Sequence, residues 1–204
     1  FLSLDATAAT LEPEQFDNYE VGAKWDILPS LSATVAVFRL DRSNTRATGP
    51  TPGTVVLTGE QRSSGVELGL VGQVTPMWQV ALGYAMIDGE IRATTSAAPA
   101  GRRLAQLPEH QLSLWNRFDV TDRLGLGVGV YHQSSSRATI SGVTRLPAYT
   151  RVDAAVFFKV AEGIDAQVNV ENLLGERYFP FAHNDNNVTP GAPTNARLTV
   201  RFAF

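Results

Sequence analysis

The C-terminal segment, residues 195–204, reads NARLTVRFAF and alternates between apolar and polar or small side chains. The two sets are Leu198, Val200, Phe202 and Phe204 on one parity and Arg197, Thr199, Arg201 and Ala203 on the other. A period of two is the period of a β-strand, because successive side chains point to opposite faces of a sheet. The segment therefore predicts a strand with one apolar face and one polar face.

The same alternation recurs upstream, in segments about as long as a strand that crosses a membrane. It predicts nine strands, at residues 18–26, 31–40, 55–74, 78–87, 110–118, 124–132, 149–160, 164–172 and 196–204. Helical periodicity is poor throughout. The longest apolar run, Ala154 to Phe158, is far shorter than the roughly 20 residues that a membrane-spanning helix needs. We therefore expect an all-β chain.

The connections between these strands alternate between short and long. The short ones are residues 27–30, 75–77, 120–123 and 161–163, and the long ones are 41–54, 88–109, 133–148 and 173–195. An antiparallel, up-and-down transmembrane β-barrel explains the alternation, because its periplasmic turns are short and its extracellular loops are long. A β-sandwich, soluble or surface-attached and serving as a carbohydrate-binding module, is the competing interpretation, and it predicts a fragment that folds in water.

Aromatic residues gather beside the short turns and the C-terminus. They are Trp25, Trp78, Phe118, Phe158 and Phe204, all on the apolar parity of their strands. Membrane interfaces select bulky and amphipathic rings at one level of a sheet, so we interpret these residues as a membrane-interface girdle.

The polar parity would then face the lumen of the barrel. Its charged members are Glu20, Lys24, Glu67, Arg151, Asp153, Lys159, Asp165, Glu171, Arg197 and Arg201. Tyr131 and Tyr149 fall on the same inward parity. Charges repeated on one face predict an aqueous or plugged interior, because charged groups need water or partners there.

Composition excludes several other functions. The 204 residues carry a net charge near −3, no cysteine and only three scattered histidines. These features argue against a nucleic-acid-binding surface, a disulfide framework and a histidine or thiolate metal site. The one arrangement suggestive of an outer-membrane lipase is His132 followed by Ser134, Ser135 and Ser136, but adjacent residues at a strand end point to opposite sides. We expect a protein that is not an enzyme and has no cofactor of its own.

An odd number of strands cannot close a bacterial barrel, which has an even number. Residue 1 is Phe rather than Met and no leader pattern follows it, so the chain has either been processed or been cut from a longer protein. The odd strand count favours a cut, and we expect the chain to be the C-terminal part of a longer protein.

Several segments together resemble the TonB-dependent outer-membrane receptors. They are residues 11–14 (LEPE), 18–24 (NYEVGAK), 59–67 (GEQRSSGVE), 107–110 (LPEH) and 172–178 (NLLGERY), followed by the alternating last strand with its terminal Phe204. The resemblance implies that residues 1–204 belong to a 22-stranded barrel of the bacterial outer membrane. The N-terminal plug and the earlier strands would lie outside this chain.

Residues 183–193 (HNDNNVTPGAP) resemble the last extracellular loop of ferric-siderophore receptors. The resemblance implies capture of a ferric siderophore and its import with energy delivered by the TonB complex through the plug. Iron would enter only as a siderophore chelate. Haem, vitamin and glycan receptors remain alternatives, because Pro-Gly loops are common elsewhere. The other implied partners are outer-membrane lipid, lipopolysaccharide and the barrel-assembly machinery, which would read Phe204 in the last strand.

An anionic, often aromatic chelate needs fixed donors and ring surfaces, which Arg and Tyr supply. Position in the long connections and residue type select the candidate ligand-binding residues Arg103, Arg137, Arg145, Tyr178 and His183. Each could instead serve loop solubility or contact lipopolysaccharide phosphates.

Overall fold

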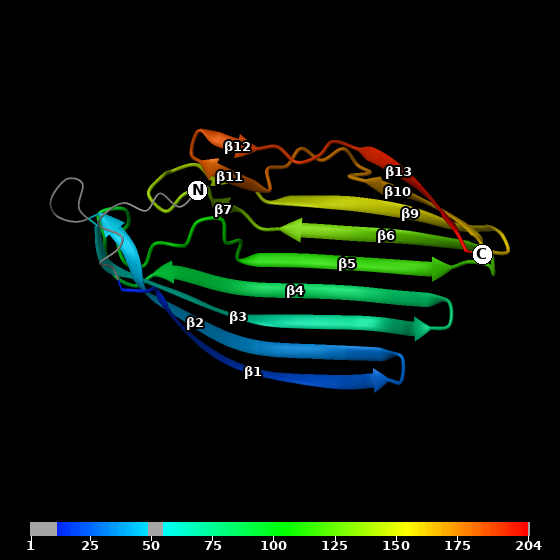
Figure 1. Cartoon of the computed structure of the whole chain (residues 1–204), viewed down its shortest axis with the longest axis horizontal. Helices are drawn as coiled ribbons and strands as arrows, with labels where there is room; N and C mark the ends of the chain where they lie inside the picture. The colour runs from blue at the N-terminus through cyan, green and yellow to red at the C-terminus, as the bar shows by residue number, and fades with distance from the viewer. Residues whose placement is uncertain (1–11, 49–54, 204) are drawn as a thin grey trace.

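The computed structural model describes residues 12–48 and 55–203, which form strands and connecting loops (Figure 1). The strands are β1 (Gln15–Leu28), β2 (Leu31–Thr48), β3 (Val55–Thr75), β4 (Trp78–Ile91), β5 (His110–Asp119), β6 (Leu124–Gln133), β7 (Ser136–Arg137), β8 (Arg145–Leu146), β9 (Tyr149–Ala161), β10 (Ile164–Glu171), β11 (Phe181–Asn184), β12 (Asn187–Thr189) and β13 (Asn195–Phe202).

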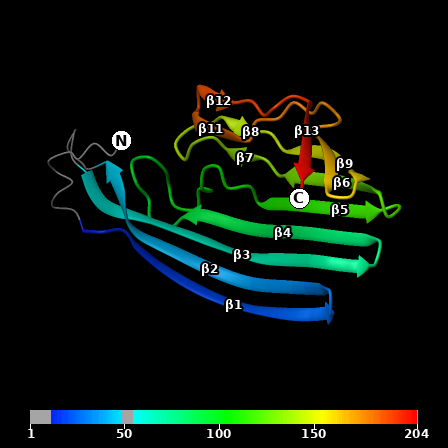
Figure 2. The ribbon, with the colours of Figure 1, turned by 45° about the vertical axis from the view of Figure 1, so that its right-hand side comes forward.

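The long strands form one nine-stranded sheet in the order β1-β2-β3-β4-β5-β6-β9-β10-β13, and every neighbouring pair is antiparallel. The short turns lie at one end of the sheet and the long connections at the other (Figure 1). The sheet curls toward its β13 edge (Figure 2). The predicted nine strands and the alternation of short and long connections are confirmed.

The predicted loop at residues 41–54 is wrong over residues 41–48. There β2 continues as a strand, and its pairing with β3 reaches Thr48 and Val55. Register shifts around Thr45 let the two strands stay paired, and Asn44 absorbs the irregularity with a φ of 58°. This pairing is decided across the sheet, where periodicity along a single strand gives no signal.

Two small hairpins were not predicted, and both lie in the long connections. One pairs β7 with β8, and the other pairs β11 with β12. Their strands are too short for an alternating pattern to be recognised in the sequence.

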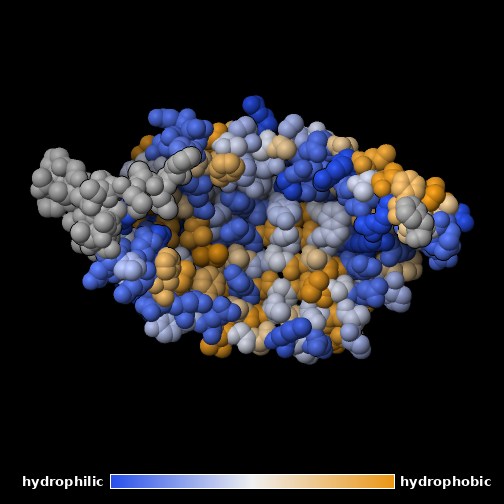
Figure 3. Space-filling view, in the orientation of Figure 1, coloured by the Kyte–Doolittle hydropathy of each residue, from blue (hydrophilic) through white to orange (hydrophobic). Residues whose placement is uncertain are grey.

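The cross-strand register places the apolar parities of all nine strands on one face. One row of directly opposed residues runs through Trp78, Phe118, Leu126, Val156, Val168 and Leu198. We call this side the apolar face and the opposite side the polar face. Large side chains on the apolar face are exposed, with Trp25 at 68% and Val156 at 42%. Figure 3 shows hydrophobic and pale residues across the middle of the sheet and hydrophilic ones mainly toward its ends.

The predicted girdle residues that the structure describes, Trp25, Trp78, Phe118 and Phe158, all lie on the apolar face near the short turns. Trp78 stacks on Phe118 with ring centroids 5.8 Å apart, and its Nε1 donates a hydrogen bond to Asn116 Oδ1 at 3.0 Å. Phe204 lies outside the described residues.

The β-sandwich does not fit this structure, because the described residues provide no second layer to cover the apolar face of the sheet. Their one cluster of fully buried apolar residues lies in the loops instead, around Ala138, Leu146 and Ala182. Within residues 12–48 and 55–203, no helix is long and apolar enough to cross a membrane.

Candidate functional site

Three long connections pack together at one end of the sheet. They are residues 92–109, 134–148 and 172–194, which we call the loop block. Leu146, Ala138 and Ala182 form its buried core, against which Phe179 and Val188 pack. Apolar burial of this kind is the main source of stability in a folded unit. The loop block therefore has a core of its own.

Gln106 ties the three connections together. Its side-chain Nε2 donates to Ala182 O at 2.8 Å and lies 3.4 Å from Ala138 O, while its Oε1 accepts from Ala182 N at 3.3 Å. Its backbone N donates to Arg137 O at 2.8 Å. The side-chain amide thus pairs with a backbone amide as a neighbouring strand would. Sequence reasoning gave no signal for this role.

Asp185 forms a second link, between the last loop and residues 139–144. Its carboxylate accepts from Thr139 Oγ1 at 2.7 Å and from Thr144 N at 3.2 Å. The hydrogen bond from the Thr139 hydroxyl, followed by those from the side chain and the backbone amide of Thr144, lowers the pKa of Asp185, because hydrogen bonds to the charged form favour it. The ionised carboxylate thus holds the two loops together.

Asn172 fixes the root of the last loop. It is fully buried and adopts a φ of 54°, a left-handed conformation that Asn tolerates better than most residues. Its side chain donates to Glu176 O and Ala192 O and accepts from Glu176 N. Its backbone N donates to Asp153 Oδ1 at 2.8 Å, and its carbonyl accepts from Thr194 Oγ1 at 2.6 Å. The NLLGERY segment, recognised in the sequence only as a resemblance, thus has a structural function.

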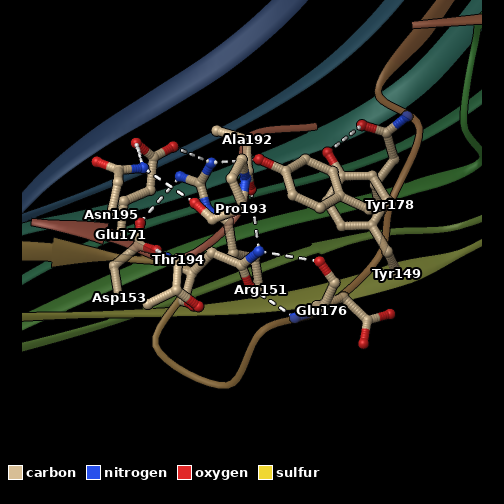
Figure 4. A network of polar contacts seen from close by, with 12 residues as sticks. Tyr149, Arg151, Asp153, Glu171, Glu176, Tyr178, Ala192, Pro193, Thr194 and Asn195 are labelled. Carbon is tan, nitrogen blue, oxygen red and sulfur yellow. Dashed lines mark hydrogen bonds and ion pairs between the residues drawn. The ribbon is translucent and has the colours of Figure 1, made fainter. Parts of the chain in front are cut away.

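Arg151 joins this root to the polar face of the sheet (Figure 4). Its Nη2 contacts Asp153 Oδ2 at 2.9 Å, and its Nη1 contacts Glu171 Oε1 at 2.6 Å and Tyr178 OH at 3.1 Å. Its guanidinium also lies 5.1 Å from the centroid of the Tyr131 ring. Because two carboxylates and a hydroxyl already occupy both Nη groups, Arg151 acts here as an anchor for the loop.

The five candidate ligand-binding residues are dispersed over the loop block. Arg137 and Arg145 are direct cross-strand partners in the β7–β8 hairpin, so their side chains leave the same side of it. Arg103 pairs with Glu109 at 2.7 Å and lowers the pKa of that carboxyl. His183 is exposed on β11. The structure therefore brings only Arg137 and Arg145 together.

Tyr178 lies inside the block rather than on its surface. It is only 7% exposed, and its ring packs 4.6 Å from the Tyr149 ring, centroid to centroid. Gly191 allows this packing, because a Cβ there would overlap the Tyr178 ring. The hydroxyl reaches Arg151, as described above. Tyr178 is thus part of the packed interior of the loop block, between Tyr149 and Arg151.

The polar face also carries the aromatic residues Trp115 and Phe157. Trp115 lies over β6, where a Cβ on Gly129 would come within 2.7 Å of its Cε3 atom. The guanidinium of Arg117 lies 4.3 Å from the centroid of the Phe157 ring. The glycines at alternate positions of β6, Gly127 and Gly129 among them, were the signal that a bulky neighbour covers this strand.

The candidate lipase arrangement is not assembled in the structure. His132 lies on the apolar face, and its Nδ1 contacts Thr150 Oγ1 at 2.8 Å. Ser134 Oγ instead accepts from the backbone N of His110 at 3.0 Å. In the part of the chain that the structure describes, no group of His, Asp and Glu residues could hold a metal ion.

Comparison with known proteins identifies the class of protein to which this sheet and its loop block belong. Residues 3–173 match the family described as TonB dependent receptor-like, beta-barrel. The chain therefore belongs to the TonB-dependent receptors and forms part of their barrel domain. Such barrels lie in the outer membrane of Gram-negative bacteria, with the apolar face toward lipid and the polar face toward the lumen. The family consists of transporters, which confirms the prediction that the protein is not an enzyme.

Individual relatives narrow the comparison. The probable TonB-dependent siderophore receptor PiuA of Acinetobacter baumannii is 29% identical over 99% of this chain, which spans 28% of PiuA. The metal-pseudopaline receptor CntO of Pseudomonas aeruginosa is 32% identical over 98% of this chain, which spans 29% of CntO. The crystal structure of PiuA superposes with a TM-score of 0.89 over 98% of this chain and 30% of that one, at 30% identity. The chain thus spans less than a third of the relatives it matches.

Proposed function

We propose that this chain is the C-terminal part of the barrel of a receptor that binds a ferric siderophore at the cell surface and imports it with TonB-coupled energy. The observation that carries the proposal is similarity along nearly the whole chain to siderophore receptors such as PiuA and the catecholate receptor Fiu of Escherichia coli, the latter at 30% identity over 98% of the chain. Import of haem, a vitamin or a glycan is the alternative that the ligand test below would reveal.

The strands that would precede β1 and the plug belong to the same proposal. A receptor of this kind would close a 22-stranded barrel with strands that precede β1 and pair with β13. Its plug would fill the lumen against the polar face and carry the contact to the TonB complex. Iron would enter already coordinated by the siderophore, so the barrel itself would need no metal ligands.

The β7–β8 hairpin supplies the best candidate contact for the ligand. Arg137 and Arg145 are directly opposed, and like charges in that position destabilise a strand pair. An anionic chelate would offset that cost and accept hydrogen bonds from both guanidinium groups. Arg103 and His183 would extend the contact, whereas Tyr178 would support it from beneath.

Uptake of labelled ferric siderophore by cells tests this proposal. In the full-length receptor, the double variant Arg137→Gln/Arg145→Gln should weaken chelate binding about tenfold or more, as loss of two charge-assisted contacts predicts. Arg123→Gln, in the short turn at the other end of the sheet, controls for loss of charge and should bind normally. Unchanged affinity in the double variant would remove both arginines from the site. Wild-type cells that take up haem or cobalamin but no siderophore would overturn the proposed ligand.

The last strand carries a further part of the proposal. Phe204 would belong to the signal read by the barrel-assembly machinery, and its deletion should lower the amount of full-length receptor inserted in the outer membrane. Normal surface levels, measured by surface labelling, would reject that role.

A further inference from the structure

Two arginines share one carboxylate on the apolar-face parity of β2 and β3. Arg39 Nε donates to Asp41 Oδ2 at 2.7 Å, and Arg62 Nε donates to Asp41 Oδ1 at 2.6 Å. Within the described residues, these are the hydrogen bonds that the two guanidinium groups make to side chains. Asp41 therefore aligns both groups while leaving their Nη donors for other acceptors.

The register places Arg39 and Arg62 at the edge of the lipid-facing apolar surface. Arg39 is the next residue on its face after Val37, which is 57% exposed, and it lies opposite Tyr19 on β1, which is 65% exposed. Asp41 lies opposite Arg62 in turn. A tyrosine at this level is typical of the boundary between hydrocarbon and headgroups. The two arginines thus lie at the level of the lipid headgroups.

The boundary in question is the extracellular one. Arg39 and Arg62 lie beyond the Val37–Val66 pair in the direction away from the short turn at residues 29–30, and so toward the end of the sheet that carries the long connections. In an outer-membrane barrel that end is outside the cell. The polar lipid of that leaflet is lipopolysaccharide, whose diglucosamine headgroup carries phosphates. Arginine forks match phosphate oxygens in geometry and charge.

We infer that Arg39 and Arg62, aligned by Asp41, form a clamp for a phosphate of the lipopolysaccharide headgroup. The inference depends on the membrane orientation of the barrel and is independent of the imported ligand.

The neighbouring charges fit such a headgroup layer. Glu90, opposite Arg62, is already engaged by Arg92 at 2.6 Å. Asp17 and Asp88 share the same face, opposite Asp41 and Ser64 respectively. Lipopolysaccharide phosphates are bridged by divalent cations, which carboxylates can help to bind. A belt with both signs of charge therefore suits this lipid better than a purely basic one would.

Native mass spectrometry of the full-length receptor with defined lipids tests the clamp. The variant Arg39→Gln/Arg62→Gln should bind lipopolysaccharide about tenfold more weakly or worse, because it removes two charge-assisted contacts to phosphate. Its binding of phosphatidylglycerol should change less than threefold. The control Arg197→Gln/Arg201→Gln removes the same charge from the lumenal parity of β13 and should leave both affinities unchanged.

Folding is checked separately, by heat-modifiable migration on gels. Should the glutamine pair fail to fold, Arg39→Lys/Arg62→Lys keeps the charge but loses the fork, and it should still weaken lipopolysaccharide binding at least threefold. Unchanged lipopolysaccharide binding in a folded variant would overturn the inference. An equal loss of both lipids would also overturn it, because the contact would then be one of general surface charge.

Discussion

The sheet and the loop block differ in where their apolar side chains lie. The sheet exposes its large apolar side chains on one face, as Trp25 and Val156 show, and the described residues leave that face uncovered. The loop block buries Leu146 to 2% exposure and Asn172 completely, and it satisfies the Asn172 side chain with hydrogen bonds from its own chain. The apolar face of the sheet thus needs its surroundings to cover it, whereas the loop block buries its apolar side chains within itself.

This difference separates what membrane lipid stabilises from what the loops stabilise. In lipid, backbone groups must be paired within the protein, and the long ladders of the sheet provide that pairing. In water, apolar burial and satisfied polar groups are needed, and the loop block provides them in the core around Leu146 and in the hydrogen bonds of Asn172. A mutation should therefore act differently in the two regions, even where the residue types are similar.

The largest effect is expected from a charge on the lipid-facing surface. Val156 lies between Leu126 and Val168 in register, so Val156→Arg should destabilise the full-length receptor by about 2 to 4 kcal/mol near the middle of the bilayer. Urea unfolding in lipid vesicles measures this change. Thr199→Arg, on the lumenal parity of β13, is the matched control and should cost far less. Equal losses would refute the assignment of the two faces.

Asn172→Ala should have the next largest effect, about 2 to 3 kcal/mol locally. It leaves the backbone N–H of Glu176 and the carbonyls of Glu176 and Ala192 without the partner they have in Asn172, and it strains a left-handed backbone. Amide hydrogen exchange of residues 172–194 should rise while β9 stays protected. Asn172→Gly separates the two causes, since glycine accepts the backbone conformation but lacks the side-chain contacts. If both variants exchange like the parent, the hydrogen bonds of Asn172 do not hold the loop.

Leu146→Ala should cost about 2 kcal/mol within the loop block, near the low end for a buried leucine because the small core can partly collapse. The expected result is faster exchange around β7 and β8 with unchanged unfolding of the sheet. Val143→Ala, at a position that is 88% exposed, should change neither. Global unfolding at the same lower urea concentration in Leu146→Ala would show that the two regions are one cooperative unit.

The smallest effect is a dependence on pH at Asp185. Its pKa is lowered in the folded state, so its link to Thr139 and Thr144 is fully present above the unfolded-state pKa of about 3.9 and is lost as pH falls through the lower folded value. Protection of residues 139–144, measured as the exchange rate relative to the intrinsic rate at each pH, should therefore be constant near neutral pH and fall only below about pH 4. Asp185→Asn should remove this acid response; its persistence would assign the response to another group.

Much of the sheet could be predicted from sequence because each strand carries its own alternation. The predicted strands 31–40 and 78–87 ended too early, because strand pairing continues beyond the alternating pattern, to Thr48 in β2 and to Ile91 in β4. In the loop block, the candidate residues came from type and position alone. Gln106 and Asp185 were missed because their partners are 32 to 76 residues away in the chain for Gln106 and 41 to 46 for Asp185.

The sequence by itself determined the strands, the two faces of the sheet and the end at which the long loops lie. These features follow from a local period of two, which fixes side-chain direction before any contact forms. Only the tertiary structure decided that Tyr178 is buried, that Arg151 anchors the last loop and that Asp41 aligns Arg39 with Arg62. Those outcomes depend on contacts between separate strands and loops, and a period within one strand carries no information about its partners.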